Sequence, residues 1–361
     1  MSAPQEPAAA VIARLSPAIM GVLDALEYAA RHVAPDTLTQ LATAMAGRGE
    51  AVDAALAESR AMDWPDRWAP VRECLESAAE QASRSLISFS VAADDMRAAG
   101  RALRLAVRAT EALYPLAGFM RGISAHFIEP AARGDPAIIA RIAAAQPGRD
   151  GVGTLHLGGP PGTRGGASLY VPEYDDGVRS WPLVVALHGG SGNGGDFLWT
   201  WLRTARTTGC VLLAPTAIGE TWSLTEPEID GPNIARLMAG VTAQWRIDPR
   251  RMLLTGMSDG GTFCYSWGLG RDCPCTHLAP VAAGYHPFLM GFADIERLPG
   301  FPVRITHGAR DWMFAATTAR EAARTLRAAG ANVEQVDIAD LAHAYPREEN
   351  SAILDWLLGK S

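Results

Sequence analysis

The chain has 361 residues, of which 48% are apolar and 20% charged, and its formal net charge is −7. These values are typical of a globular protein with two domains or one large domain. The acidic balance argues against a nucleic acid or an anionic membrane as the main partner.

The first residues, Met1 to Pro7, lack the basic stretch and continuous apolar core of a signal peptide. We find no long uncharged apolar run after them, and therefore expect a cytoplasmic protein without an integral membrane segment. The cysteines are odd in number and irregularly spaced, which fits reduced thiols. Cys273-Pro-Cys275 could be a metal or redox pair, but no C-x-x-C motif or pair of histidines accompanies it, so we expect structural thiols and neither metal nor cofactor.

Residues 8–145 are rich in alanine, leucine and arginine, and their apolar residues recur at steps of three and four, as at Ile19, Leu23 and Leu26. This spacing predicts an all-helical N-terminal domain of five to seven helices, with Asp36 and Asp135 as candidate helix N-caps. Because no catalytic constellation lies in this region, we expect it to form a lid over an active site or the interface of a homo-oligomer.

Residues 146–166 are rich in glycine and proline and form either a linker or the first hairpin of a sheet, since 154–157 and 168–171 both resemble short strands. From there strands and helices alternate up to residue 361. The predicted strands are 183–187, 211–214, 252–255, 281–283, 303–306 and 333–338, and the predicted helices are 197–207, 233–245, 317–329 and 348–358. This α/β pattern predicts a mostly parallel sheet flanked by helices over residues 154–361, with ligand groups at the carboxyl ends of the strands.

Ser258 lies in the segment Gly256-Met-Ser-Asp-Gly260, between an apolar strand and a segment that can start a helix. A serine on such a sharp turn has a strained backbone, and its neighbours must lack a Cβ atom so that strand and helix can approach. This context is typical of the nucleophile elbow of a serine hydrolase, although the motif alone also arises in ordinary glycine-rich loops.

Two glycine-rich segments could supply an oxyanion hole for a nucleophile at Ser258. The segment His188-Gly-Gly-Ser-Gly directly follows a predicted strand, and its glycines allow backbone N–H groups to turn toward a substrate oxygen. We expect the N–H groups of Gly190 and Asp259 to form the oxyanion hole, with Ser191 as the substitute for Gly190. The alternative, a phosphate-binding loop, fits neither of the usual glycine motifs.

Two further loops could complete a catalytic triad. Asp311 follows a strand and is placed to accept the Nδ1–H of a histidine, with Asp337 and Asp340 as alternatives. His343 follows the last strand and would take the proton of Ser258. His286 is the alternative base, but it precedes Asp311 and therefore breaks the order nucleophile, acid, histidine that is usual for such enzymes.

With these segments in this order, residues from 154 onward resemble an α/β-hydrolase-fold serine esterase. The H-G-G-S-G, G-M-S-D-G-G, H-G-A-R-D and A-H-A-Y-P segments are similar to those of the phospholipase/carboxylesterase group and its dienelactone-hydrolase, feruloyl-esterase and polyhydroxybutyrate-depolymerase-like relatives. The resemblance implies metal-free hydrolysis of carboxylic esters through an acyl-serine intermediate. The helical region before residue 154 departs from the compact members of these families.

We therefore expect hydrolysis of short to medium acyl or aryl esters, with a small-molecule ester as the substrate. Aromatic residues on the loops could line the substrate pocket, although each could also be core packing. The alternatives are an amidase, peptidase or acyltransferase that uses the same triad, and an inactive binding or scaffold protein. The candidate pocket residues are Trp199, Trp222, His286 and Trp312.

Overall fold

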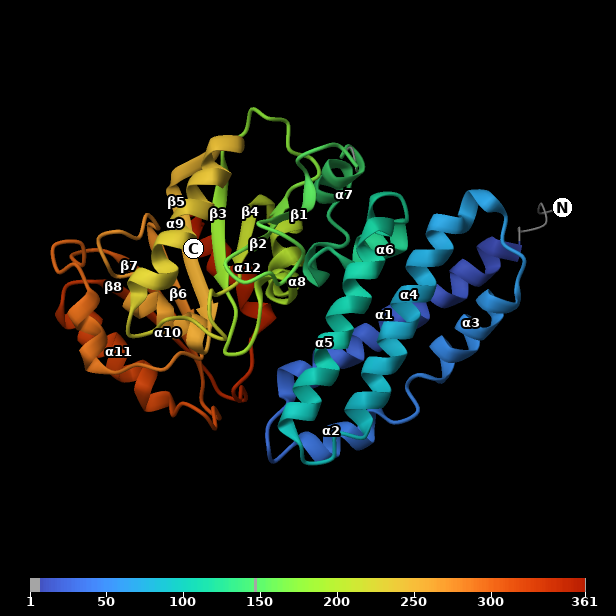
Figure 1. Ribbon diagram of the computed structural model, residues 1–361, viewed down its shortest axis with the longest axis horizontal. Helices are drawn as coiled ribbons and strands as arrows, with labels where there is room; N and C mark the ends of the chain where they lie inside the picture. Colours follow the sequence, from blue (N-terminus) through green and yellow to red (C-terminus); the bar gives the residue numbers. More distant parts are fainter. Residues whose placement is uncertain (1–6, 146–147, 361) are drawn as a thin grey trace. The chain divides into compact units, whose positions relative to one another are not determined.

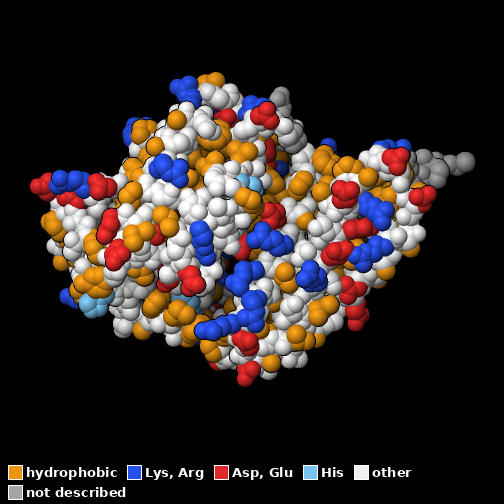
Figure 2. Space-filling model, in the orientation of Figure 1, with side chains coloured by type: hydrophobic (Ala, Val, Ile, Leu, Met, Phe, Trp, Pro, Cys, Tyr) orange, Lys and Arg blue, Asp and Glu red, His pale blue; other side chains and the backbone are white. Residues whose placement is uncertain are grey.

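The computed structural model describes residues 7–145 and 148–360, so that residues 146 and 147 of the expected linker lie outside the described part. The chain divides into two compact units, Met1–Arg133 and Gly134–Ser361, which we call the helical unit and the sheet unit (Figure 1). On the face drawn in Figure 2, acidic and basic side chains are interspersed among apolar ones.

The helical unit consists of packed α-helices without a strand in its described residues, as the apolar spacing predicts. Its core lies where α1 and α5 pack against α4, and it contains Leu15, Ile19, Leu75 and Phe89. The helices are α1 (Pro7–His32), α2 (Leu38–Met45), α3 (Glu50–Ala61), α4 (Ala69–Ser90), α5 (Met96–Leu113) and α6 (Arg121–His126).

Helix α1 corrects the expectation that the chain has no long apolar run. Among the described residues, α1 is a helix that is long and apolar enough to cross a membrane. Its residues Leu15, Ile19 and Leu26 are buried, and it contacts α3, α4 and α5, as the core helix of a globular unit would. A signal sequence near an N-terminus can have the same length and apolar composition, so the cytoplasmic location stays a prediction.

Side-chain capping agrees with one of the two predicted N-caps. Asp135 caps α7 (Pro136–Ala143), which belongs to the sheet unit, by accepting the N–H groups of Ala137 and Ile138. Asp36 was the wrong candidate for α2, because the N-cap position is Thr37 and no side chain caps the helix there. Proline at the first position of α7 fits its start, where a backbone N–H has no intrahelical partner.

The sheet unit contains one eight-stranded sheet with the order β1-β2-β4-β3-β5-β6-β7-β8. The pair β1 and β2 is antiparallel and forms the hairpin that was one of the two sequence interpretations of this region. β2 is also antiparallel to β4, and the other strands are parallel to one another. The strands are β1 (Gly153–Leu157), β2 (Ala167–Val171), β3 (Trp181–Leu187), β4 (Val211–Pro215), β5 (Ile247–Met257), β6 (His277–Val281), β7 (Pro302–Gly308) and β8 (Asn332–Ile338).

Every residue of β3 and β4 is buried, which explains their continuous apolar sequences, because helices cover both faces of the parallel sheet. Helices α8 and α12 contact each other and pack on β3 and β5, respectively, whereas α10 packs on β5 and β6, and α11 on β7 and β8. These helices lie along the strands in Figure 1. Their bounds are α8 (Gly194–Thr204), α9 (Pro227–Gln244), α10 (Asp259–Ser266), α11 (Ala316–Ala328) and α12 (Asn350–Leu357).

Candidate active site

Ser258 stands between the end of β5 and the start of α10, with φ 54° and ψ −118°. Residues with a β-carbon rarely adopt this backbone conformation, so the backbone at Ser258 is strained. The glycines around it are required by close approach: a Cβ atom on Gly256 would lie 2.6 Å from the carbonyl of Gly260, and one on Gly260 would lie 2.5 Å from the carbonyl oxygen of His188. The serine is thus held at the tip of a sharp strand-to-helix turn.

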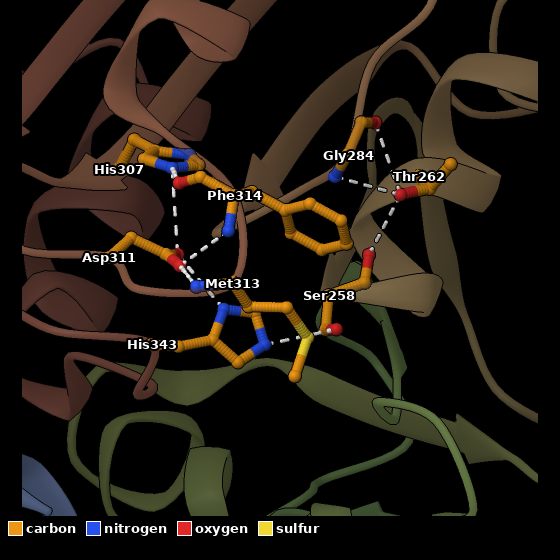
Figure 3. A network of polar contacts seen from close by, with 8 residues as sticks. All are labelled: Ser258, Thr262, Gly284, His307, Asp311, Met313, Phe314 and His343. Atoms are coloured by element: carbon orange, nitrogen blue, oxygen red, sulfur yellow. Dashed lines mark hydrogen bonds and ion pairs between the residues drawn. The ribbon is translucent and has the colours of Figure 1, made fainter. Parts of the chain in front are cut away.

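Asp311 and His343 converge on Ser258 from two other loops (Figure 3). Nε2 of His343 lies 3.1 Å from Oγ of Ser258, and Nδ1 of the same ring lies 2.9 Å from Oδ2 of Asp311. The loops follow β7 and β8, which are adjacent parallel strands, so their carboxyl ends meet at one edge of the sheet. The structure therefore brings the three predicted residues together.

The carboxylate of Asp311 is fully buried and hydrogen-bonded at both oxygens. Oδ1 accepts the N–H groups of Met313 and Phe314 at 2.9 and 2.8 Å, and Oδ2 faces His343. Burial by itself raises the pKa of Asp311, but the hydrogen bonds from His343, Phe314 and Met313 outweigh it and hold the pKa below its ordinary value. Asp311 is therefore an anion at neutral pH.

Close backbone contacts hold the acid and histidine loops against each other. A Cβ atom on Gly308 would lie 2.2 Å from the carbonyl oxygen of Leu341, and the N–H of Arg310 donates to that oxygen at 3.0 Å. On the histidine side, the hydroxyl of Tyr345 donates to Asn350 at 2.8 Å. The contacts of Gly308 and Arg310 with Leu341 fix the spacing between the two loops, and the Tyr345–Asn350 bond ties the histidine loop to the start of α12.

The loop after β3 passes beside the nucleophile. A Cβ atom on Gly189 would lie 3.6 Å from Cβ of Ser258, and one on Gly190 would lie 2.8 Å from Oδ2 of Asp259. The N–H of Gly192 donates to the carbonyl of Gly189 and closes a turn in which Ser191 has φ 57°. The candidate oxyanion donors Gly190 and Asp259 are thus neighbours in space.

The sheet order and the position of Ser258 after β5 now decide the fold. The sheet unit has the α/β-hydrolase fold. This fold is defined by mostly parallel strands flanked by helices, by an antiparallel first pair of strands, and by a strained serine on a strand-to-helix turn. This agrees with the fold expected from the sequence.

Solved structures that resemble the chain have low sequence identity to it. A thermostable esterase is 20% identical with a TM-score of 0.42, over 54% of this chain and 58% of that one, so the chain spans little more than half of its length. A fluorophosphonate-binding serine hydrolase of Staphylococcus aureus is 14% identical with a TM-score of 0.46, over 57% of this chain and 97% of that one. Zea mays acyl-protein thioesterase 2 is 16% identical with a TM-score of 0.43, over 54% of this chain and 98% of that one. No family model and no curated protein matches the sequence.

His188, for which the sequence predicted no role of its own, is a buried residue of the sheet unit. Its Nε2 accepts the N–H of Ala217 at 3.1 Å, so its Nδ1 carries the proton and donates to the carbonyl of Gly189 at 2.7 Å. Burial lowers the pKa of His188 to about 4. A neutral imidazole therefore ties the candidate oxyanion loop to the loop after β4.

The structure gives the candidate pocket residues different roles. Trp222 is 2% exposed and donates its indole N–H to the carbonyl of His188, so it is a core residue and not a pocket wall. Trp199 is also buried, in α8. Trp312 is exposed, and its ring centroid lies 5.8 Å from that of His343. The ring centroid of Phe314, which the sequence did not single out, lies 5.5 Å from that of His343.

The alternative acid and base have other contacts. His286 is exposed, and its Nδ1 accepts the N–H of Phe288 at the start of a short helix. Asp337 pairs with Arg320 at 3.2 Å. In the parts of the chain described by the structure, no group of three His, Cys, Asp or Glu side chains could hold a metal ion, and Cys273 and Cys275 are buried free thiols.

Proposed function

We propose that this protein is a serine hydrolase that cleaves carboxylic esters, with Ser258 as the nucleophile. One observation carries the proposal: Oγ of Ser258, the imidazole of His343 and the carboxylate of Asp311 form a continuous chain of contacts at 3.1 and 2.9 Å. A serine hydroxyl is a weak nucleophile at neutral pH, and an adjacent, oriented base activates it. An inactive scaffold protein would have no need for this chain.

In the first half of the reaction, Oγ of Ser258 attacks the ester carbonyl carbon while Nε2 of His343 takes the hydroxyl proton. The imidazolium that forms is stabilised by the anionic Asp311, which also holds the ring with Nδ1 protonated. When the tetrahedral intermediate collapses, Nε2 returns the proton to the leaving alcohol. An acyl group then remains bound to Ser258.

The carbonyl oxygen becomes negatively charged in the tetrahedral intermediate and needs hydrogen-bond donors. The N–H of Asp259 is the first of α10, where it has no intrahelical acceptor. The glycine loop beside it can supply the second N–H at Gly190, with Ser191 as the substitute. Losing one such donor typically costs about 3 kcal/mol of transition-state stabilisation.

Hydrolysis of the acyl enzyme reverses the roles. A water molecule donates a proton to Nε2 of His343 and attacks the acyl carbon, and the bond to Oγ breaks as the imidazolium returns the proton to Ser258. The free carboxylic acid then leaves. The same two oxyanion donors serve both halves of the reaction.

The side chains around His343 support apolar ester substrates. Trp312 and Met313 are 45% and 49% exposed, and Phe314 lies against the imidazole. Apolar side chains beside a few oriented polar groups are the usual composition of a small-molecule site. We propose short to medium acyl esters or aryl esters as the substrate class.

Hydrolysis of p-nitrophenyl esters, from acetate to palmitate, tests the proposal. We expect turnover that falls as the acyl chain lengthens and is abolished by Ser258→Ala. Ser266→Ala, on the same helix α10, is the matched control and should retain activity. The corresponding p-nitroanilides separate ester from amide preference. Full activity of Ser258→Ala, or no attachment of a fluorophosphonate probe to Ser258, would exclude the proposed nucleophile.

A further inference from the structure

His307 lies outside the proposed triad but next to its acid. It is in β7, four residues before Asp311, and its side chain is almost completely buried. Its Nε2 lies 2.8 Å from the carbonyl oxygen of Phe314 and 3.5 Å from Oδ2 of Asp311 (Figure 3). The same carboxylate oxygen accepts Nδ1–H of His343. Two imidazole rings therefore face one oxygen of the acid.

The surroundings of His307 define its protonation state. A carbonyl oxygen can only accept, so Nε2 must carry the proton that bonds Phe314. Nδ1 is buried and has no hydrogen-bond partner among the described residues. A second proton at Nδ1 would place an unsatisfied charged donor in the interior, which is costly. His307 is thus neutral, with its single proton on Nε2.

The contacts of His307 and Asp311 form a closed ring through Phe314. The Nε2–H of His307 bonds the carbonyl of Phe314, whose own N–H donates to Oδ1 of Asp311 at 2.8 Å. His307 therefore anchors the far end of the turn that begins at Asp311. The same turn carries Phe314, whose ring lies against His343.

We propose that His307 is a positioning residue that orients the carboxylate of Asp311 toward His343. This inference rests on the function proposed above. By holding the carbonyl of Phe314, His307 keeps both backbone donors on Oδ1, and this leaves Oδ2 directed at Nδ1 of His343. His307 touches neither the substrate nor the reacting atoms.

Loss of this anchor has a specific kinetic consequence. With the Asp311–Phe314 turn relaxed, the carboxylate of Asp311 would stabilise the His343 imidazolium that forms during the reaction less well. A misplaced catalytic group can cost about 10²-fold in rate, so we expect a fall of this order in kcat with a much smaller change in KM.

The test compares His307→Leu with His307→Gln. The amide nitrogen of Gln can reach the position of Nε2 and donate to Phe314, whereas Leu cannot. We expect His307→Leu to lose about 10²-fold in kcat with little change in KM, and His307→Gln to restore most of kcat. Rates should be divided by the concentration of active sites, determined by titration with a fluorophosphonate. A loss of folded protein is then not mistaken for a loss of kcat.

Equal impairment of the Leu and Gln variants, or a loss in His307→Leu that lies in KM and not in kcat, would overturn the inference. If neither variant folds, ¹⁵N NMR of histidine-labelled wild-type protein provides the test. The ring of His307 should carry its proton on Nε2, bonded to Phe314, and a proton on Nδ1 instead would contradict the proposal. Ser258→Ala is assayed in parallel, because an active Ser258→Ala would refute the proposed function, whereas an unimpaired His307→Leu beside an inactive Ser258→Ala would refute only the role of His307.

Discussion

Nδ1 of His343 lies 2.9 Å from Oδ2 of Asp311, although 32 residues separate them in the chain. The contact spans two loops at the ends of the adjacent strands β7 and β8. It fixes the tautomer of His343, because the carboxylate accepts the Nδ1 proton and leaves Nε2 free to accept one from Ser258.

Asp311→Asn should reduce kcat by about 10⁴-fold, because an amide that donates to Nδ1 imposes the wrong tautomer on His343. Binding should change little, so the loss should be in kcat more than in KM. Steady-state kinetics with a p-nitrophenyl ester measures this. Asp337→Asn is the control, since Asp337 pairs with Arg320, and a comparable loss in that variant would contradict the assignment.

His343→Ala and His286→Ala should separate the two candidate bases. His343→Ala should abolish measurable ester turnover, because it removes the base whose Nε2 lies 3.1 Å from Oγ of Ser258. His286→Ala should retain turnover, since its ring is exposed and caps a short helix. Turnover rates and fluorophosphonate labelling of both variants give the answer, and the reverse pattern would exchange their roles.

Ser258→Gly should make the protein more stable while it abolishes turnover. At φ 54° and ψ −118° the serine pays a conformational strain that glycine does not have, and such strain is of the order of 1–3 kcal/mol. We expect the thermal midpoint of Ser258→Gly to exceed that of Ser258→Ala, which keeps the Cβ atom. Equal midpoints for the two variants would mean that the turn carries no strain.

Because His188 is buried, the free energy of unfolding should decrease in mild acid. Its pKa is lowered to about 4 in the folded protein by burial, whereas in the unfolded chain it is about 6.5. Between these values the unfolded state binds a proton that the folded state does not, so stability falls as the pH decreases from about 6.5 to 4. The complete effect is on the order of 3 kcal/mol.

Chemical denaturation at pH 7 and pH 5 measures this effect of His188. In His188→Gln the amide can still accept from Ala217, but it does not titrate, so the variant should lose less stability between the two pH values than the wild type. The same pH dependence in both proteins would show that His188 does not contribute. The stability that Asp311 contributes is lost at lower pH than that of His188. The pKa of Asp311 lies below its ordinary value, and this stability is lost only as the pH falls through that pKa.

The helical unit is proposed to act as a lid or an assembly surface. Ile87 and Val91, at the end of α4, are 58% and 73% exposed, and this apolar pair is the first place to test. Ile87→Ser with Val91→Ser should lower the molar mass measured by light scattering, or alter the preference for acyl-chain length. If neither quantity changes, these two side chains have no part in the proposed role.

The sequence alone was sufficient for the parts of the fold that depend on local pattern. Continuous apolar segments predicted the buried strands β3 and β4, and the three- and four-residue spacing predicted the helical unit. The motifs around Ser258, Asp311 and His343 follow strands, and a parallel sheet places the carboxyl ends of its strands at one edge. Their meeting in space could therefore be anticipated, while their chemical roles remain a proposal.

Element ends and single-residue environments were predicted less well. Helix α9 begins at Pro227, six residues before the predicted start, because the pattern does not reveal how far a loop continues. Trp222 was a candidate pocket residue, but it packs between His188 and Phe263 in the core. An aromatic residue on a loop has the same sequence signature in either place.

Sequence by itself determined the class of the fold, the order of the glycine, serine, aspartate and histidine motifs, and the chemistry that they suggest. Only the tertiary structure decided that His188 anchors the glycine loop and that His307 faces Asp311, since both depend on packing between segments distant in the chain. Hydrophobic periodicity records which face of an element is buried. It does not record which side chain or carbonyl from another element lies opposite, and these contacts set the protonation states around Ser258.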